Sequence, residues 1–386
     1  MVIVLLRVAR MLPVAACAAS FGYLIFTLQR VVLFRTNRDS GPRFTPPVTI
    51  LKPICGLDPE MLGALRSFCE QDYPAAHQVI FSVRRADDPA IPLIRKLIAE
   101  DSTRDIALVV DDRVFGPNLK VSALQNALGV AKHDIFVIAD SDMRVERDYL
   151  RRVVGEFRDP SVGAVTCLYR GSADGNISSQ LGAMFINDWF LPSVLVALAV
   201  EDLRFCFGAT MAVRRTVLED IGGFPALAPY LADDYMLGKL VSDRGLEVRL
   251  APYVVEDLVA EPGPGSLVKH ELRWARTVRT VRPVGYAMSF VTDTLPLSLL
   301  VLFTSHVAAT GFGVVGLALL MRALLHAVVH RRLEIRGPIR LWLVPARDML
   351  SFAIRVASFF GRDVEWRRRR YFVYPSGRML AKGVEE

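Results

Sequence analysis

The sequence predicts an α/β fold, in which a mainly parallel sheet carries helices on both faces, with membrane segments before and after it. Short β-branched runs alternate with stretches of helical periodicity between residues 47 and 260, which is the pattern of such a sheet. Apolar segments flank this region on both sides. Charged residues are 23% of the 386 residues, and most of them lie in the central stretch, which argues against a polytopic transporter.

The composition narrows the classes of partner. Hydrophobic residues make up 52% of the chain and the mean hydropathy is +0.32, which excludes intrinsic disorder. The formal net charge of +7, from 47 Lys and Arg against 40 Asp and Glu, fits anionic lipid headgroups or a phosphorylated substrate. A nucleic acid is the weaker alternative, because no basic stripe with interleaved aromatic residues occurs.

The cysteines predict neither a disulfide framework nor a zinc site. Their number is odd and no CxxC pair occurs, so we expect buried, reduced thiols in a protein that faces the cytoplasm. The five are Cys17, Cys55, Cys69, Cys167 and Cys206.

Residues 1–36 are predicted to form an N-terminal membrane anchor. The segment 11–34 is nearly uncharged, and a helix needs about 20 residues to cross the hydrocarbon core. The alternative is a cleaved signal peptide, or a lipoprotein signal that ends at Cys17, but the apolar run continues past any such cut. Several basic residues against the single Asp39 then predict that the next domain faces the cytoplasm. These basic residues are Arg30, Arg35, Arg38 and Arg43.

The α/β domain is predicted to span residues 47–282. Its predicted strands are 48–51, 79–83, 106–110 and 135–139, with the first ended by Lys52-Pro53, and its predicted helices include 59–70, 89–100 and 119–131. Ligands of such sheets bind beyond the carboxyl ends of the strands. Several acidic residues of this chain follow these ends, so the chemistry is expected there.

The chain is predicted to return to the membrane over residues 285–362. The apolar stretch 295–329 contains His306 and Arg322; it is long for one span and short for two, so a tight hairpin is expected. Residues 341–360 carry Arg and Asp near their middle and are expected to lie in the membrane interface.

Residues 363–386 are predicted to be a basic tail. Trp366 is followed by four arginines. Because a membrane segment comes immediately before this run, an anionic cytoplasmic leaflet is its expected partner. A solvated charge run is the alternative.

The strongest local signal for chemistry is Asp140-Ser141-Asp142, directly after the predicted strand 135–139. Two carboxylates at i and i+2 beyond a strand end can both face one hard cation, which prefers oxygen ligands and commonly bridges to substrate phosphates. Asp140 and Asp142 are therefore predicted to hold such a cation. The alternative is a solvated turn, because acidic residues are common in loops.

Two further groups fit a substrate that contains a nucleotide. One carboxylate of Asp87-Asp88 is predicted to accept hydrogen bonds from a base or ribose, while the alternative for Asp88 is an N-cap of the helix that follows. Lys120 lies in the first turn of a predicted helix, beside free amide groups, where it can meet phosphate oxygens. The alternative for Lys120 is an ordinary solvated lysine.

Asp233 and Asp234 stand at the start of another helical stretch. A carboxylate there can serve as the general base that deprotonates an attacking hydroxyl. The alternative is that the two acids only complement the helix dipole.

A cationic and aromatic helix face is predicted just before the C-terminal membrane part. His270, Arg273, Trp274 and Thr277 recur at helical spacing and so share one face. That face offers cations for a diphosphate and an indole for stacking. A basic amphipathic helix in the membrane interface is an equal alternative.

Together these motifs resemble the D, DxD, D, (Q/R)xxRW series of membrane-bound inverting glycosyltransferases with the Rossmann-like GT-A fold. The matching segments are Asp87-Asp88, Asp140-Ser141-Asp142, Asp233-Asp234-Tyr235 and His270-Glu271-Leu272-Arg273-Trp274. Other segments resemble the ceramide glucosyltransferase branch (family 21, of family 2 type), namely Leu51-Lys52-Pro53 with Gly56 and Asp58-Pro59, and Glu70-Gln71-Asp72-Tyr73-Pro74. Three segments are most similar to bacterial hopanoid-biosynthesis members: Cys167-Leu168-Tyr169-Arg170-Gly171, Cys206-Phe207-Gly208-Ala209-Thr210-Met211 and His270-Glu271-Leu272-Arg273-Trp274-Ala275-Arg276.

The resemblance implies transfer of a sugar, with inversion, from a UDP-sugar to a hydroxyl of a membrane lipid. Asp87 or Asp88 would contact the uridine part. Asp140 and Asp142 would bind Mg²⁺ or Mn²⁺ and the diphosphate, and Asp234 would be the base. Arg273 and Trp274 would line the nucleotide and acceptor side, with Asp233 and His270 also on the acceptor side.

The hopanoid members imply N-acetylglucosamine transfer to bacteriohopanetetrol, by a multi-pass protein of the bacterial inner membrane whose catalytic domain faces the cytoplasm. One departure from the pattern is His270, where Gln or Arg is usual. Asp142 is present, although eukaryotic ceramide enzymes lack this second acid, which favours metal use. The alternatives are a ceramide glucosyltransferase, a processive polysaccharide synthase, which should have more membrane helices, and a non-catalytic membrane scaffold.

Overall fold

The computed structural model describes residues 2–36, 44–173, 175–305, 307–367 and 369–382. It divides into two compact units. The sheet unit comprises Arg35–Arg170, Asp202–Ala260 and Arg367–Glu386, and the helical unit comprises Met1–Phe34, Gly171–Glu201 and Glu261–Trp366. Some residues of the sequence-based predictions lie outside the described part: Arg38, Asp39, Arg43, His306 and Arg368.

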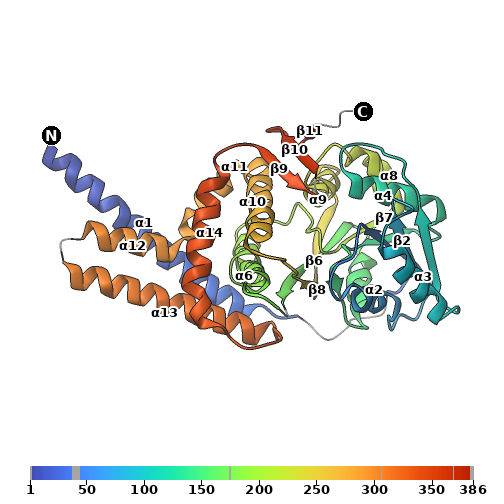
Figure 1. The fold of residues 1–386 in the computed structure, drawn as a ribbon, viewed down its shortest axis with the longest axis horizontal. Helices are drawn as coiled ribbons and strands as arrows, with labels where there is room; N and C mark the ends of the chain where they lie inside the picture. The colour runs from blue at the N-terminus through green and yellow to red at the C-terminus, as the bar shows by residue number, and fades with distance from the viewer. Residues whose placement is uncertain (1, 37–43, 174, 306, 368, 383–386) are drawn as a thin grey trace. The chain divides into compact units, whose positions relative to one another are not determined.

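The main sheet has eight strands in the order β3-β2-β1-β4-β7-β6-β8-β5. Figure 1 labels β2, β6, β7 and β8 of this sheet. The first four of these run parallel, while β7 is antiparallel to both β4 and β6, and β5 is antiparallel to β8. Their bounds are β1 (Val48–Ile54), β2 (His77–Val83), β3 (Asp105–Val110), β4 (Ile135–Ile138), β5 (Met143–Arg144), β6 (Val162–Ser172), β7 (Met211–Arg214) and β8 (Glu247–Leu258). The predicted α/β class with a mainly parallel sheet is confirmed.

Helices cover both faces of this sheet because alternate residues of its strands point to opposite sides. Ile50 of β1 belongs to one buried cluster, together with Leu65, whereas the next residue, Leu51, belongs to a second cluster, together with Leu124. The helices of this unit are α2 (Met61–Cys69), α3 (Ala90–Glu100), α4 (Leu119–Ala127), α5 (Tyr149–Gly155), α8 (Arg215–Asp220) and α9 (Asp233–Asp243), with short turns η1 (Leu128–Val130), η2 (Glu156–Arg158) and η4 (Phe224–Ala226).

Two predictions for the sheet unit need correction. Strand β1 does not end at Lys52-Pro53 but runs to Ile54, because the Lys52 side chain can stay buried by donating to the Asp140 carbonyl. All five cysteines are free, and four are buried, but Cys55 is exposed, since it follows the last residue of β1 in a loop.

The basic tail contains regular structure. Strands β10 (Arg369–Val373) and β11 (Met379–Lys382) pair antiparallel. The backbone N–H of Met379 donates to the carbonyl of Pro229 at 2.9 Å, and that of Leu231 donates to Gly377 at 3.3 Å. The tail is therefore anchored on the sheet unit by backbone hydrogen bonds.

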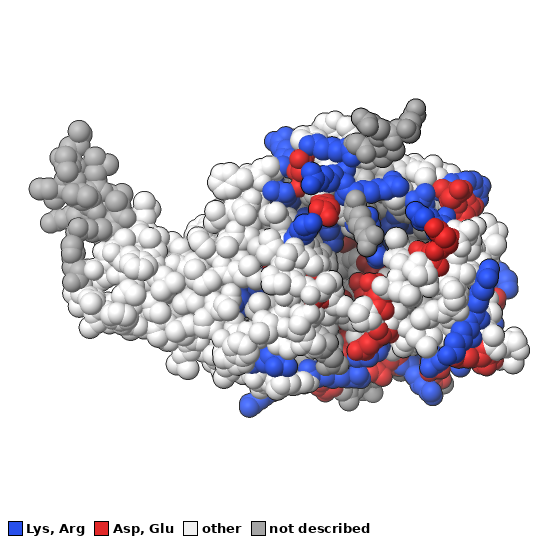
Figure 2. Space-filling model, viewed as in Figure 1, with Lys and Arg blue, Asp and Glu red and all other residues white. Residues whose placement is uncertain are grey.

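The helical unit contains two helices that are long and apolar enough to cross a membrane, Met11–Leu33 within α1 and Ala308–Arg332, and a third span arises if the bent pair Pro283–Thr292 and Thr294–Thr304 crosses as one. Several large apolar side chains on these helices are exposed, including Phe303, Phe312 and Leu320, as expected of a lipid-facing surface. Figure 2 shows most of this surface in white, without acidic or basic side chains.

The elements of the helical unit come from three parts of the chain. They are α1 (Val2–Leu33), α6 (Ile177–Phe185), the π-helical turn η3 (Ile186–Phe190), α7 (Leu191–Ala197), α10 (Pro264–Val281), α11 (Pro283–Met288), η5 (Ser289–Thr292), α12 (Thr294–Thr304), α13 (Ala308–Arg332), η6 (Leu341–Leu343), α14 (Val344–Ser358) and β9 (Asp363–Trp366). The apolar stretch 295–329 thus forms two helices, α12 and α13. Helix α14 has 15 residues, fewer than the about 20 needed for a span.

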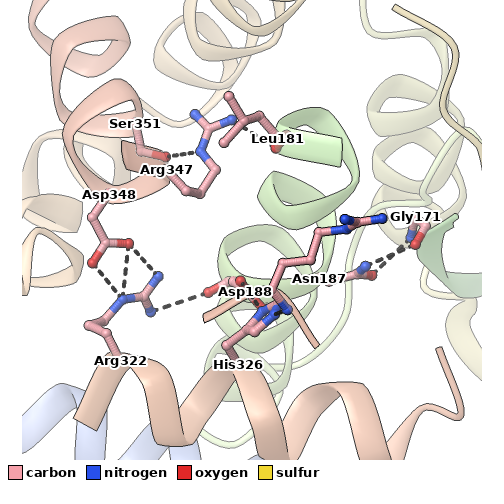
Figure 3. Close-up of polar contacts among 10 residues, drawn as sticks. Gly171, Leu181, Asn187, Asp188, Arg322, His326, Arg347, Asp348 and Ser351 are labelled. Carbon is pink, nitrogen blue, oxygen red and sulfur yellow. Dashed lines mark hydrogen bonds and ion pairs between the residues drawn. The ribbon is translucent and has the colours of Figure 1, made fainter. Parts of the chain in front are cut away.

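Buried ion pairs connect these helices (Figure 3). Arg322 of α13 donates from Nε and Nη2 to the Asp348 carboxylate of α14 at 2.8–3.1 Å. The neighbouring His326 contacts Asp188 of η3, with 2.8 Å between Nδ1 and Oδ2. The side chains of Arg322 and Asp348 are only 5% and 1% exposed. Charges at such depth occur in pairs because an isolated one is costly to desolvate.

The variant Asp348→Ala is therefore expected to destabilise the helical unit by about 3–5 kcal/mol, because Arg322 stays buried without its counter-charge. The double variant Arg322→Met/Asp348→Leu should recover most of this loss. Thermal unfolding in detergent measures both. The matched control is Glu365→Ala, which removes an exposed pair with Lys269 and should cost less than about 1 kcal/mol. An equal loss of stability in Asp348→Ala and Glu365→Ala would contradict the conclusion that the buried Arg322–Asp348 pair stabilises the helical unit.

Candidate active site

The Asp140-Ser141-Asp142 loop follows the fully buried strand β4 at its carboxyl end. The backbone N–H of Ala139 donates to Leu51 of β1 at 3.2 Å, so the loop starts in register with the neighbouring strand. Lys52 of β1 donates from Nζ to the Asp140 carbonyl at 2.7 Å. The same ammonium group lies 3.5 Å from the ring centroid of Phe68. A buried cation thus holds the first residue of the loop in place.

Asp140 and Asp234 converge on one glycine from distant parts of the chain. A Cβ atom added to Gly208 would lie 3.3 Å from Oδ2 of Asp234 and 3.4 Å from Oδ2 of Asp140. Helix α9, which starts at Asp233, approaches closely because Gly238 has no side chain to collide with Phe205. The two carboxylates therefore face a common point at the edge of the sheet.

Lys120 connects Asp140 with Asp233, the residue that precedes Asp234. Its Nζ lies 2.7 Å from Oδ1 of Asp140 and 3.5 Å from Oδ2 of Asp233. The side chain of Lys120 is only 14% exposed, so it is not the solvated lysine of the alternative interpretation. Asn118, the N-cap of α4, also donates to Asp233 at 3.2 Å. The N-termini of α4 and α9 are thereby tied together beside Asp140.

Burial dominates the electrostatics of this site. It raises the pKa of Asp142 to about 6, with the Asp140 charge adding to the effect. It likewise raises the pKa of Asp234 to about 6, with Asp233 adding and Lys120 opposing. Burial lowers the pKa of Lys52 to about 7 against the pull of Asp142 and Asp140. For Lys120 burial also lowers the pKa, but the carboxylates of Asp140 and Asp233 outweigh it and the net shift is upward.

The residues present fit a divalent cation. Four carboxylates and two ammonium groups, when ionised, carry a formal charge of −2 (Asp140, Asp142, Asp233 and Asp234 against Lys52 and Lys120). Oδ1 of Asp142 is buried and makes no hydrogen bond, as expected of an oxygen kept for a ligand. Within the described ranges, no group of three or more His, Cys, Asp or Glu side chains could hold a metal ion, so substrate oxygens would have to complete the coordination.

The structure separates the roles of Asp87 and Asp88. The Asp88 carboxylate accepts hydrogen bonds from the backbone N–H groups of Gly56 and Ala90, each at 2.9 Å, so it fixes the start of α3 and the loop after β1. Asp87 has a side chain that is 68% exposed and pairs with Arg85. Asp87 is the one of the two whose carboxylate is accessible from solvent.

The predicted face of α10 belongs to the helical unit. The His270 ring lies 4.2 Å from that of Trp274, which stacks on Phe185 at 5.8 Å between centroids. The guanidinium group of Arg273 lies 5.9 Å from the ring centroid of Trp366. Nδ1 of His270 lies 2.7 Å from Oε1 of Glu261.

Sequence reasoning missed two residues, Lys52 and Glu261. Lys52 gave a signal, because it is a lone charge within the apolar run of β1 (Val-Thr-Ile-Leu-Lys-Pro-Ile), and such a charge needs a buried partner. Glu261 gave none, since a single acid in a loop before a helix is ordinary.

Comparison with known proteins agrees with this architecture. Glycosyl transferase family 21 matches residues 12–379. A ceramide glucosyltransferase of Candida albicans is 30% identical over 159 residues, which are 36% of this chain and 29% of that protein. Ceramide glucosyltransferase 3 of Caenorhabditis elegans is 20% identical over 409 residues, or 97% of this chain and 85% of that protein.

Among solved structures, the fold is similar to that of a mannosyltransferase from Pyrobaculum calidifontis in complex with GDP-Man and Mn²⁺. The TM-score is 0.57 at 21% sequence identity, over 91% of this chain and 99% of that one. The resemblance to GT-A glycosyltransferases of the ceramide glucosyltransferase type is thereby confirmed. The chain belongs to glycosyl transferase family 21 and is a sugar-transferring enzyme with the GT-A fold.

Proposed function

We propose that this enzyme transfers a sugar, with inversion, from a UDP-sugar to a hydroxyl of a membrane lipid. The observation that carries the proposal is the convergence of Asp140 and Asp234 on Gly208, in a chain that also has helices long enough to span a membrane. The names of the similar proteins support a lipid acceptor, because ceramide is a membrane lipid. The specific reaction proposed is N-acetylglucosamine transfer to bacteriohopanetetrol, with glucose transfer to ceramide as the second candidate.

Asp234 is proposed as the general base. Its carboxylate takes the proton of the acceptor hydroxyl while the acceptor oxygen forms a bond to the anomeric carbon and the bond from that carbon to the diphosphate breaks. Attack from the face opposite the leaving group inverts the configuration at that carbon. The raised pKa of Asp234, which burial causes, brings its proton affinity closer to neutral pH, as suits a general base.

The donor is proposed to bind through the acidic loop and its neighbours. Asp140 and Asp142 would hold Mg²⁺ or Mn²⁺, which supplies electrostatic stabilisation of the departing diphosphate when bound. Asp87 would accept hydrogen bonds from the uridine part. Lys120 already contacts Asp140 at 2.7 Å, so it would offer its remaining N–H groups to phosphate oxygens.

Other residues are assigned by the resemblance. Arg273 and Trp274 are proposed to contribute to the nucleotide and acceptor side, and Asp233 and His270 to the acceptor side. The apolar helices would confine the enzyme to the plane of the lipid, raising the effective acceptor concentration. We propose a multi-pass protein of the bacterial inner membrane with the catalytic domain facing the cytoplasm.

Lipid mass spectrometry after deletion of the gene tests the proposal. One glycolipid should disappear while its aglycone accumulates, and expression of the wild-type chain, but not of Asp234→Asn, should restore it. A hopanoid aglycone would support the first acceptor, and ceramide would support the second. An unchanged lipid profile would contradict a lipid acceptor.

A further inference from the structure

The first arginine of the basic tail lies beside the carboxyl end of β1. Nη1 of Arg367 donates to the carbonyl oxygen of Cys55 at 2.5 Å. Cys55 follows the last residue of β1 and comes four positions after Leu51. Leu51 lies opposite Ile138 in the parallel pair of β1 and β4, and Asp142 comes four positions after Ile138. Cys55 and Asp142 therefore leave the sheet at the same edge, and Arg367 lies there with them.

The loop that accepts this hydrogen bond is held in place. The backbone N–H of Gly56 donates to the Asp88 carboxylate at 2.9 Å, and the same carboxylate fixes the start of α3. Gly56 has a φ of 77°, which glycine adopts without steric cost. The carbonyl of Cys55 is therefore a fixed acceptor, on a loop bonded to the neighbour of Asp87.

The hairpin of β10 and β11 is attached beside the N-terminus of α4. In addition to its backbone hydrogen bonds with residues 229–231, the guanidinium group of Arg378 lies 5.8 Å from the ring centroid of Tyr230. The carbonyl of Tyr230 accepts from Nδ2 of Asn118 at 2.9 Å. Asn118 is the N-cap of α4, two positions before Lys120. The tail is thus fixed to the segment that also places Lys120.

The charge of Arg367 reaches the acidic loop. Burial raises the pKa of Asp142 to about 6, and the charge of Arg367 opposes this rise. Arg367 is nevertheless an exposed residue. Its guanidinium group has five N–H groups, so the bond to Cys55 leaves donors for a ligand.

Two more guanidinium groups lie at this edge of the sheet. Arg84 directly follows the last residue of β2 and donates from Nη2 to the carbonyl of Asp112 at 3.0 Å. Burial lowers the pKa of Arg84, and the charge of Arg369 in β10 adds to this lowering. Like charges held close together disfavour each other. An anion bound at this edge would relieve that repulsion.

The chemistry of Arg367 fits a diphosphate. A guanidinium group is a planar fork that can bond two phosphate oxygens at once. Lys120 is already shared between Asp140 and Asp233, at 2.7 and 3.5 Å. A diphosphate that meets the acidic loop would therefore gain from a second cation that no carboxylate bonds directly among the described residues.

We propose that Arg367 is a donor-binding residue, whose guanidinium group holds a phosphate oxygen of the nucleotide-sugar beside the acidic loop. This inference rests on the proposed function, because it takes the donor to be a nucleoside diphosphate sugar. The sequence alone indicates an anionic membrane lipid as the partner of the basic run. The bond to Cys55 favours the nucleotide for Arg367, because it fixes the side chain at the edge of the sheet where the acidic loop lies.

Calorimetric titration of UDP into the full-length enzyme, in a neutral detergent with Mn²⁺, tests the inference. Arg367→Gln removes the charge and keeps a side chain that can still donate to the Cys55 carbonyl. It should weaken UDP binding about 10- to 100-fold, the usual range for a hydrogen bond that involves a charged group. Arg367→Lys should lose less affinity, because it keeps the charge and lacks only the fork. Uridine, which has no phosphate, should bind Arg367→Gln and the wild type equally.

Arg370→Gln is the matched control. Arg370 is an exposed arginine of the same tail, and alternate residues of a strand point to opposite faces. Its neighbour Tyr371 is buried, as is Val373 on the same face, so Arg370 points away from the interior of the sheet unit. The affinity for UDP should stay at the wild-type value in this control.

Three results would overturn the inference. The first is equal affinity for UDP in Arg367→Gln and the wild type. The second is a parallel loss of UDP and uridine binding in Arg367→Gln, which indicates that Arg367 only holds the loop. The third is intact UDP binding together with weaker binding to vesicles that contain phosphatidylglycerol, which would assign Arg367 to the membrane.

The same titrations separate this inference from the proposed function. The expected loss of UDP affinity in Arg367→Gln, with an unchanged lipid profile after deletion of the gene, would count against the lipid acceptor alone. A wild-type enzyme that binds neither UDP nor GDP would overturn the proposed donor and the role of Arg367 together. A wild-type enzyme that binds UDP with no loss in Arg367→Gln would overturn only the role of Arg367.

Discussion

Replacing Asp234 by Asn is expected to lower the rate of sugar transfer by about 10²- to 10⁴-fold, the usual contribution of a positioned general base. The substitution keeps the size of the side chain and its ability to accept the 2.8 Å hydrogen bond from the N–H of Tyr235. It removes the capacity to take a proton. Binding of a UDP-sugar should therefore survive, which calorimetry on the purified variant would show.

The matched control is Asp243→Asn at the other end of α9. Asp243 makes an exposed pair with Lys239, and a helical pair of this kind contributes about 0.3–0.5 kcal/mol. Activity should stay close to that of the wild type. Retained turnover in Asp234→Asn would remove Asp234 from the base role and direct attention to its neighbour, Asp233.

Removing either carboxylate of the acidic loop is expected to abolish most of the gain in UDP affinity that Mn²⁺ provides. Asp140→Ala and Asp142→Ala should each reduce this gain by about 10- to 100-fold. Mutating residues that only hydrogen-bond to metal ligands typically lowers metal affinity by this factor, so removing a ligand itself should cost at least as much. Lys120 keeps its charge in Asp140→Ala and loses the carboxylate 2.7 Å away. Binding of UDP without metal should therefore not weaken in that variant.

Titration of UDP with and without Mn²⁺ measures both quantities. Asp134→Ala is the matched control, because Asp134 lies at the other end of β4 from Asp140. The side chain of Asp134 is 90% exposed. The gain from Mn²⁺ should be unchanged in this control. If Asp140→Ala and Asp142→Ala also kept the full gain, the acidic loop would not be the metal site.

The parts of the fold that depend on local pattern could be predicted from the sequence. The runs at β2, β3 and β4 are β-branched and bounded by polar loops, and their alternation with amphipathic stretches implies a parallel sheet. The place of Asp140 at a strand end follows from the same pattern. Even the two-sided cover of the sheet follows, because adjacent residues such as Ile50 and Leu51 are both apolar.

The contacts that define the site could not be predicted, because they join distant positions. Nothing local to Lys120 indicates that its ammonium group lies between Asp140 and Asp233. The same holds for the pairing of Glu261 with His270, which depends on how the start of α6 holds a loop. Spacing predicts which residues share a helix face, but only packing decides what that face meets.

The polar contacts of α13 have a consequence for how the chain is assembled. A helix that carries Arg322 and His326 is poorly suited to stand alone in hydrocarbon, and its partner Asp188 precedes His326 by 138 positions. Translation therefore delivers one half of this contact well before the other. Asp348, the counter-charge of Arg322, follows by 26 residues. In the proposed multi-pass topology, α13 can complete both contacts only after Asp348 has been synthesised, so its final packing would follow the synthesis of most of the chain.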